Sequence, residues 1–247
     1  MLSNASTSSS LDTPKGNGRA LTAWVILLAI VLADQMVKYF IKTHFVLHES
    51  VPITPWFELL FTENRGLAFG MEFIGTAFLA LFRVAAIVVF SIALVRFIRR
   101  RVPYGLVVCG ALIIAGAIGN IIDNLFYGLI YTESLPFGEP ARLVPFGEGY
   151  GSFLSGRVVD MLYFPLFTWP EWMPWCGGDV FFGAIFNVAD ASISCGAVAL
   201  ILFYFKYLTR EQFFGKVKVD GDPAEAQSDR TETEPKSQEH KPTERNV

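Results

Sequence analysis

Four long runs of apolar residues dominate the sequence and predict its main elements. Crossing a bilayer takes about 20 helical residues, because the hydrocarbon core is about 30 Å thick. The runs that reach this length cover residues 21–40, 74–95, 104–127 and 180–205. The fold class that this pattern predicts is an all-α membrane protein with four transmembrane helices.

Two long loops separate these helices, and the first of them contains an extended segment. The loop of residues 41–73 carries two prolines, the extended-looking run 56–62 and a turn signal at 63–66. The loop of residues 128–179 is rich in proline, glycine and aromatic residues, and its three tryptophans suit a membrane interface. We therefore expect a small β element in the first loop and a long second loop.

The two ends of the chain differ in composition from the rest. Residues 1–19 are mostly Ser, Thr, Asn and other polar or small residues, and residues 211–247 are highly charged. Neither segment has apolar periodicity, so both are expected to be disordered cytoplasmic segments. The four-helix transmembrane domain is expected to cover residues 20–210.

Composition supports a membrane protein, and charge placement orients it. Hydrophobic residues make up 52% of the 247 residues, and aromatic residues 15%. The formal net charge of -3 averages over compartments, but the basic residues are unevenly placed. Those that flank the helices on one side are Lys15, Arg19, Arg96, Arg99, Arg100, Arg101, Lys206, Arg210, Lys216 and Lys218. By the positive-inside rule both termini are cytoplasmic, and both long loops, with the β element, are extracytoplasmic.

A secretory signal peptide over residues 21–33 is the alternative interpretation of the first apolar run. The helical pattern continues beyond Ala33, however, and places Asp34 and Lys38 four residues apart, where they can pair on one helix face. This spacing favours a retained first helix.

Carboxylates in and beside the helices are the candidate chemistry. Asp190 is the only charged residue in the run 180–205, and charges at such depth normally face a protein interior or a water-filled cavity. At about 1.5 Å per residue, Asp190 lies about 24 Å from Lys206, and Asp123 about 33 Å from Arg101. Both therefore lie at the outer edge of the membrane, a level that Asp160 in the second loop can also reach.

Polar amides accompany these carboxylates. Asn120 and Asn124 share a helix face with Asp123, and Asn187 shares one with Asp190. The sequence shows no Ser/His, Ser/Lys or Cys/His catalytic pattern, and its three cysteines have no metal-ligand spacing, so we expect no metal and no cofactor. Two adjacent carboxylates that share one proton can act as the acid and the base of an aspartic protease.

Three other interpretations of the carboxylates stay open on spacing alone. They could cap helices and hold the bundle together, or they could relay ions in a small carrier. A non-enzymatic scaffold would use the Trp-rich loop as its binding surface. In each case membrane lipid is the expected environment and nucleic acid is not an expected partner.

Five motifs in order give the chain a specific resemblance from about residue 34 to 196. They are Asp34-Gln35-Met36-Val37-Lys38, Asn64-Arg65-Gly66-Leu67-Ala68-Phe69, Gly119-Asn120-Ile121-Ile122-Asp123, Val158-Val159-Asp160 and Phe186-Asn187-Val188-Ala189-Asp190-Ala191. With them the chain resembles the lipoprotein signal peptidases (signal peptidase II), aspartic proteases of the bacterial inner membrane with four transmembrane helices.

The resemblance implies an activity and roles for named residues. Asp160 and Asp190 are then the catalytic pair. The surrounding polar residues that position the substrate and the pair are Asn64, Gly66, Asn120, Asp123, Asn187, Asp34 and Lys38. The implied substrate is a prolipoprotein with a diacylglyceryl-modified lipobox Cys, and cleavage falls just before that Cys.

The chain departs from the family pattern at three places. Asn124 stands where the family commonly has Arg, and Leu67 replaces a small residue. The second loop carries an insertion at about residues 129–157, where many relatives have only a few residues.

Overall fold

The computed structural model describes residues 17–64 and 76–208. Gly66, Leu67 and both terminal segments expected to be disordered lie outside these ranges, apart from residues 17–19. The elements described here belong to one structural unit that ends at Tyr207.

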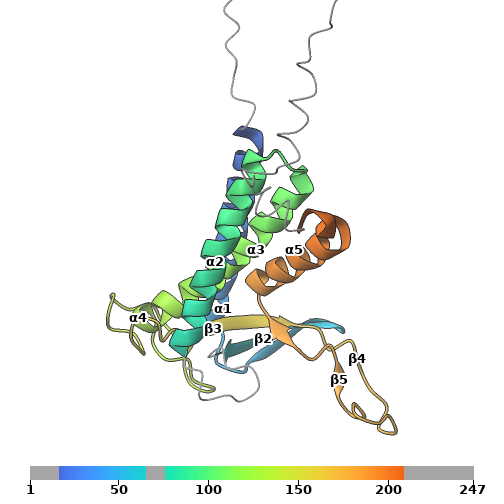
Figure 1. Cartoon of the computed structure of the whole chain (residues 1–247). Helices are drawn as coiled ribbons and strands as arrows, with labels where there is room; N and C mark the ends of the chain where they lie inside the picture. Colours follow the sequence, from blue (N-terminus) through green and yellow to red (C-terminus); the bar gives the residue numbers. More distant parts are fainter. Residues whose placement is uncertain (1–16, 65–75, 209–247) are drawn as a thin grey trace, which may run out of the picture. The chain divides into compact units, whose positions relative to one another are not determined.

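The longest elements are four helices, and three of them pack around the fourth. They are α1 (Asn17–His44), α2 (Thr76–Arg99), α3 (Tyr104–Ile122) and α5 (Val188–Tyr204) (Figure 1). Helix α3 contacts α1, α2 and α5. Within the described ranges, the helical segments Gly18–His44, Leu81–Arg99 and Tyr104–Ile130 are long and apolar enough to cross a membrane, whereas α5 is a shorter apolar helix of 17 residues.

The fourth helix begins later than the sequence pattern predicted. Residues 180–186, predicted as helix, instead contribute β5 (Val180–Phe181) and β6 (Ile185–Phe186). Short apolar runs of β-branched and aromatic residues suit a strand as well as a buried helix, so periodicity could not separate the two. Asn187 fixes the true start: its side chain accepts from the N–H of Asp190, whose carboxylate accepts in turn from the N–H of Asn187.

An antiparallel sheet lies at the end of the helices where α1 ends and α5 begins (Figure 1). Its strand order is β1 (Ser50–Thr54), β2 (Phe57–Asn64), β3 (Val158–Tyr163) and β6. The small β element predicted in the first loop is therefore present, but half of the sheet comes from segments predicted as loop or helix. Because Thr62 pairs with Asp160 in the register of β2 and β3, the sheet fixes the position of that carboxylate.

Helix α3 changes its winding beside the sheet. It continues into a π-helical turn, Asp123–Tyr127, and then into α4 (Gly128–Ile130). The π turn buries the side chains of Asp123, Asn124 and Tyr127. Single π-helical turns are frequent at functional sites because they re-aim side chains.

The insertion in the second loop is anchored to the scaffold by buried charges. Lys42 is fully buried, pairs with Glu63 and donates to Oγ of Ser134 at 2.9 Å. Arg157 pairs with Glu63 at 3.3 Å and with Glu133 at 3.0 Å. These bonds join both ends of the insertion to α1 and β2. Removing one partner of such a buried pair costs about 3–5 kcal/mol, because the other charge is left uncompensated.

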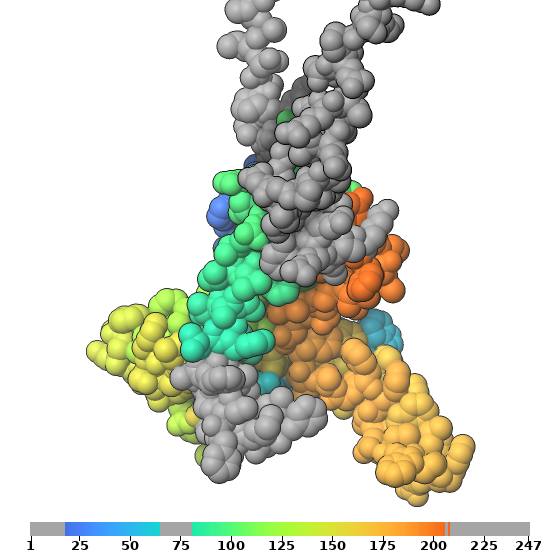
Figure 2. Space-filling view, viewed as in Figure 1, coloured from blue at the N-terminus to red at the C-terminus, as the bar shows by residue number. Residues whose placement is uncertain are grey.

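A two-stranded ribbon extends the second loop away from the sheet. It pairs β4 (Phe167–Thr168) with β5 and protrudes from the other described residues, in light orange in Figure 2. Trp172 and Trp175, beyond these strands, are exposed. Such aromatic side chains suit the membrane–water boundary, as the sequence composition indicated.

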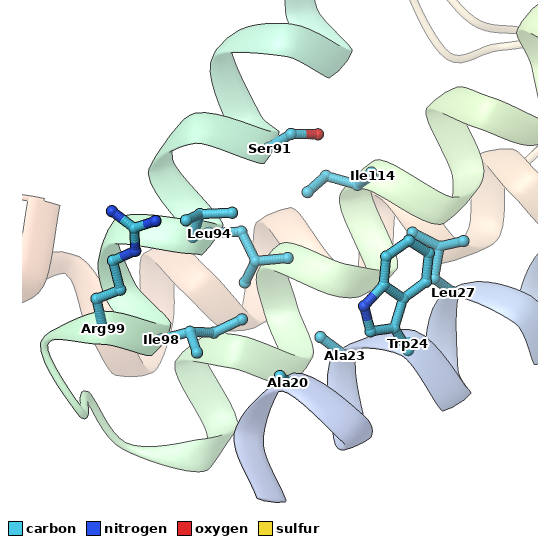
Figure 3. A pocket seen from close by; sticks show the side chains of 10 residues that line it. Ala20, Ala23, Trp24, Leu27, Ser91, Leu94, Ile98, Arg99 and Ile114 are labelled. Carbon is cyan, nitrogen blue, oxygen red and sulfur yellow. The ribbon is translucent and has the colours of Figure 1, made fainter. Parts of the chain in front are cut away.

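An apolar groove separates α1 from α2 near the start of α1 (Figure 3). Ala20, Ala23 and Trp24 line it from α1, and Leu94 and Ile98 from α2. Helix α1 is therefore held to the bundle mainly by α3 and α5 rather than by α2.

Helices α3 and α5 approach closely at Gly116. A Cβ at this position would lie 2.2 Å from the carbonyl oxygen of Ala189 and 2.7 Å from Cγ1 of Ile193. Small residues at such contacts let membrane helices meet backbone to backbone. The glycine at 116 therefore sets the distance between the two helices.

Replacing this glycine tests the close contact. Gly116→Ala is expected to destabilise the protein by about 1–3 kcal/mol, because the added methyl meets a backbone carbonyl that cannot move aside. Gly110→Ala in the same helix is the control. There the nearest atom is Cδ1 of Leu94 at 3.1 Å, the mobile end of a side chain. Thermal unfolding in detergent measures both variants. Equal midpoints for Gly116→Ala and the wild type would contradict the contact.

Candidate active site

Polar side chains from α1, α3, β3 and α5 meet where the helices join the sheet. Those that are almost fully buried are Asp34, Lys38, Asn120, Asp123, Asp160 and Asn187. Asp190 belongs to the same cluster and is half-buried. The structure thus brings together seven of the nine residues predicted for the site.

The Lys38 ammonium group lies at the centre of this cluster. It pairs with Oδ2 of Asp34 and with Oδ2 of Asp123, both at 2.8 Å, and donates to Oδ1 of Asn120 at 2.9 Å. An ammonium group has three donors, so every one of them is used. The pair of Asp34 and Lys38 predicted from the i,i+4 spacing is confirmed, and Asp123 is a second acidic partner of Lys38.

Asp123 is a structural partner of Lys38 that also holds β3. Its Oδ1 accepts from Nε2 of Gln35 at 3.0 Å, and its Oδ2 accepts from the N–H of Val159 at 3.3 Å. Val159 directly precedes Asp160. Asp123 is therefore occupied by other contacts and fixes the strand that carries Asp160.

Asn187 joins the two candidate catalytic carboxylates. Its Nδ2 donates to Oδ1 of Asp160 at 2.7 Å, and its Oδ1 accepts from the N–H of Asp190 at 2.8 Å. Asp190 Oδ1 also accepts from Nδ2 of Asn120 at 2.7 Å. A single amide thus orients one aspartate and caps the helix that carries the other.

The two aspartates differ in environment. Asp160 is 4% exposed, whereas Asp190 lies half-buried in the first turn of α5, where the helix dipole favours a negative charge. Burial, followed by the negative charge of Asp190, raises the pKa of the Asp160 carboxyl to about 7. Near neutral pH this pair can hold a single shared proton.

The remaining predicted residues lie at the edge of the described site. Asn64 is the exposed last residue of β2 and pairs with Val158, two residues before Asp160. Gly66 lies outside the described residues. Within those residues, no group of three or more His, Cys, Asp or Glu side chains could hold a metal ion.

Two further side chains contribute to the site, and the sequence did not reveal their partners. Gln35 donates to Asp123 and to the carbonyl oxygen of Gly119, and its Oε1 accepts from the Tyr127 hydroxyl at 3.1 Å. Arg83 of α2 donates to Oδ1 of Asn124. Both are polar residues inside an apolar helical run, and such residues normally have a partner in the protein interior. The sequence shows this for Arg83, but it does not indicate which residue is the partner.

Chemically, the cluster is suited to acid–base work on a bond held beside two carboxylates. Asp160 is buried and its pKa is raised to about 7, and Asp190 accepts hydrogen bonds on both carboxylate oxygens. A neighbouring acid and base of this kind can activate a water and protonate a carbonyl oxygen.

Comparisons with known proteins identify the family. The family model described as signal peptidase (SPase) II matches residues 26–206. A lipoprotein signal peptidase of Porphyromonas gingivalis is 44% identical over 192 residues, which cover 76% of this chain and 83% of that protein. A lipoprotein signal peptidase of Amoebophilus asiaticus is 33% identical over 189 residues, 72% of this chain and 75% of that protein.

Solved structures show a similar fold. A bacterial membrane enzyme determined at 1.9 Å resolution has a TM-score of 0.50 and 26% identity, over 76% of this chain and 94% of that one. Another, determined at 2.3 Å, has a TM-score of 0.50 and 25% identity, over 77% and 91%.

The family match covers most of the chain, including all five motifs on which the resemblance rested. Together with the apolar helices, it indicates a multi-pass protein of the bacterial inner membrane and a protease that processes lipoprotein signal peptides. The chain belongs to the signal peptidase II family.

Proposed function

We propose that this protein is an intramembrane aspartic endopeptidase that cleaves diacylglyceryl-modified prolipoproteins just before the lipid-modified lipobox Cys. The observation that carries the proposal is the bridge of Asn187 between Asp160 and Asp190. It supports these two as the catalytic pair, with Asn120, Asp123, Asp34 and Lys38 as the residues that hold them in place.

Asp160 is the acid and Asp190 the base in this proposal. Asp190 removes a proton from a water molecule, whose oxygen attacks the carbonyl carbon of the scissile peptide bond. Asp160 gives its proton to the carbonyl oxygen, which yields a neutral tetrahedral diol. When the C–N bond breaks, Asp190 returns a proton to the leaving amine of the Cys, and Asp160 recovers one from a diol hydroxyl.

The location of the pair suits a lipid-modified substrate. Asp190 is in the first turn of α5, at the end of the bundle beside the sheet, and the apolar helix extends from it over 17 residues. With both termini in the cytoplasm and α5 as a fourth span, this end lies at the outer leaflet. The acyl chains of a substrate there can stay in hydrocarbon while its peptide bond reaches the carboxylates.

Replacing each aspartate tests the assignment. Asp160→Asn and Asp190→Asn are each expected to lower cleavage of a diacylglyceryl-modified lipobox peptide by about a thousandfold or more, as loss of a catalytic side chain does in other proteases. Asp179→Asn, which changes an exposed carboxylate in the second long loop, is expected to leave the cleavage rate unchanged. Cleavage by purified protein and thermal midpoints are measured together. Normal turnover by either Asn variant would contradict the pair.

The acidity of Asp160 predicts a pH dependence. Because its pKa is raised to about 7, the protonated form is lost as the pH rises through this value, and kcat/KM should fall above about pH 7. A pH–rate profile gives the rate, and infrared difference spectra between the wild type and Asp160→Asn give the protonation of this carboxyl. A rate that stays constant to pH 9, or a carboxyl already ionised at pH 6, would contradict the acid role of Asp160.

A further inference from the structure

A cationic side chain lies in an apolar helix beside the catalytic pair. Arg83 is in the second turn of α2, where its neighbours Leu81, Phe82 and Val84 are exposed as a lipid-facing surface would be. Arg83 itself is half-buried. An arginine at such depth is costly and is normally retained because it contacts a charged or polar group in the protein interior.

Asn124 holds the guanidinium group of Arg83. Its Nδ2 donates to the carbonyl oxygen of Gly156 at 2.8 Å, and its Oδ1 accepts from Arg83 Nη1. The bond to Gly156 sets the orientation of this amide, since its NH₂ group is committed to a backbone acceptor. Asn124 is 1% exposed, so the contact is shielded from water.

The partners of Arg83 and Asp190 lie about one helical turn apart on α3 and its π-helical continuation. Asn120 bonds Asp190 and Asn124 bonds Arg83, and these two asparagines are four residues apart on α3 and its π-helical continuation. Side chains at this spacing start about 5–6 Å from each other. Asn124 is neutral, and Asp190 and Asp160 are among the carboxylates whose negative charge acts on the guanidinium.

A cavity lies beside Arg83 and Asn120. It has a volume of about 210 Å³, lies among α2, α3 and α5, and is lined by Arg83, Asn120 and apolar side chains that include Phe82 and Ile193. A peptide in extended conformation that enters here loses water from its carbonyl oxygens. A guanidinium group has five N–H donors in a planar fork, of which the bond to Asn124 uses one.

We propose that Arg83 is a substrate-positioning residue that donates hydrogen bonds to backbone carbonyl oxygens of the substrate next to the scissile bond. The inference rests on the proposed function. The family that the chain resembles commonly has Arg at the position of Asn124. In this chain Asn124 binds a guanidinium group that comes from α2.

Kinetics and binding of substituted full-length protein test this role. The substrate is a diacylglyceryl-modified lipobox peptide, and its Kd is measured in the cleavage-deficient Asp190→Asn background. Arg83→Met is expected to raise KM and Kd about ten- to a hundredfold, the effect of losing charge-assisted hydrogen bonds, with a smaller change in kcat. Arg83→Lys keeps the positive charge but not the planar fork of donors, so its KM and Kd should lie between those of Arg83→Met and the wild type.

Two further variants complete the design. Arg99→Met removes an exposed arginine from the far end of the same helix and should leave KM and Kd unchanged. The double change Arg83→Met with Asn124→Arg moves the guanidinium to α3 and should restore part of the lost affinity. A residue that only held α2 against α3 would not show this rescue.

The outcomes separate this inference from the function on which it rests. Cleavage by the wild type with unchanged KM and Kd in Arg83→Met would overturn the role of Arg83 alone. A lowered thermal midpoint in Arg83→Met without a change in KM would also overturn it, because it would show a structural contact only. Absence of cleavage by the wild type would overturn the proposed function, and this inference with it.

Discussion

The buried ammonium group of Lys38 is the interaction on which the rest of the site depends. A lysine without water around it must be neutralised, and here two carboxylates and one amide oxygen take its three donors. The polar atoms of these three side chains also bond other parts of the chain. Asp34 accepts from the N–H of Ala189 in the first turn of α5, and Asp123 accepts from the N–H of Val159 on β3. One cation thereby sets the relative positions of α1, α3, α5 and the sheet.

The same cation determines which way Asn120 points. Lys38 can only donate, so the side-chain oxygen of Asn120 must face it, and the NH₂ group is left to face Asp190. The amide of Asn187 is oriented in the same way, because its NH₂ group donates to Asp160 and its oxygen accepts from the N–H of Asp190. The described residues contain no buried side-chain nitrogen or oxygen without a hydrogen-bond partner. A fully satisfied network of this kind holds two carboxylates in place while leaving one of them half-exposed for chemistry.

The features in which the chain departs from the family pattern contact this network from outside. The insertion in the second loop is tied down by the ion pair of Lys42 and Glu63 and by Arg157, and its end at Gly156 accepts the bond that orients Asn124. Asn124 in turn receives Arg83. The departure at residue 124 and the insertion, which looked unrelated in the sequence, therefore meet at one place beside the proposed catalytic pair.

The amino-acid sequence by itself predicted apolar helices long enough to span a membrane and the pairing of Asp34 with Lys38. Through its five motifs it also named seven residues that the structure gathers into one polar cluster. Hydrophobic run length, i,i+4 spacing and the cost of charge in an apolar helix are local properties, which is why they can be read from the chain.

Only the tertiary structure decided the rest. The start of α5 at Val188 depends on the capping bonds between Asn187 and Asp190, which override the helical appearance of residues 180–186. The strand that carries Asp160 exists because β2 pairs with it across about 100 residues of sequence, and no local pattern encodes such a pairing. Likewise, the partners of Lys38 and Arg83 lie on other helices, so their separation in sequence hid contacts that packing alone produces.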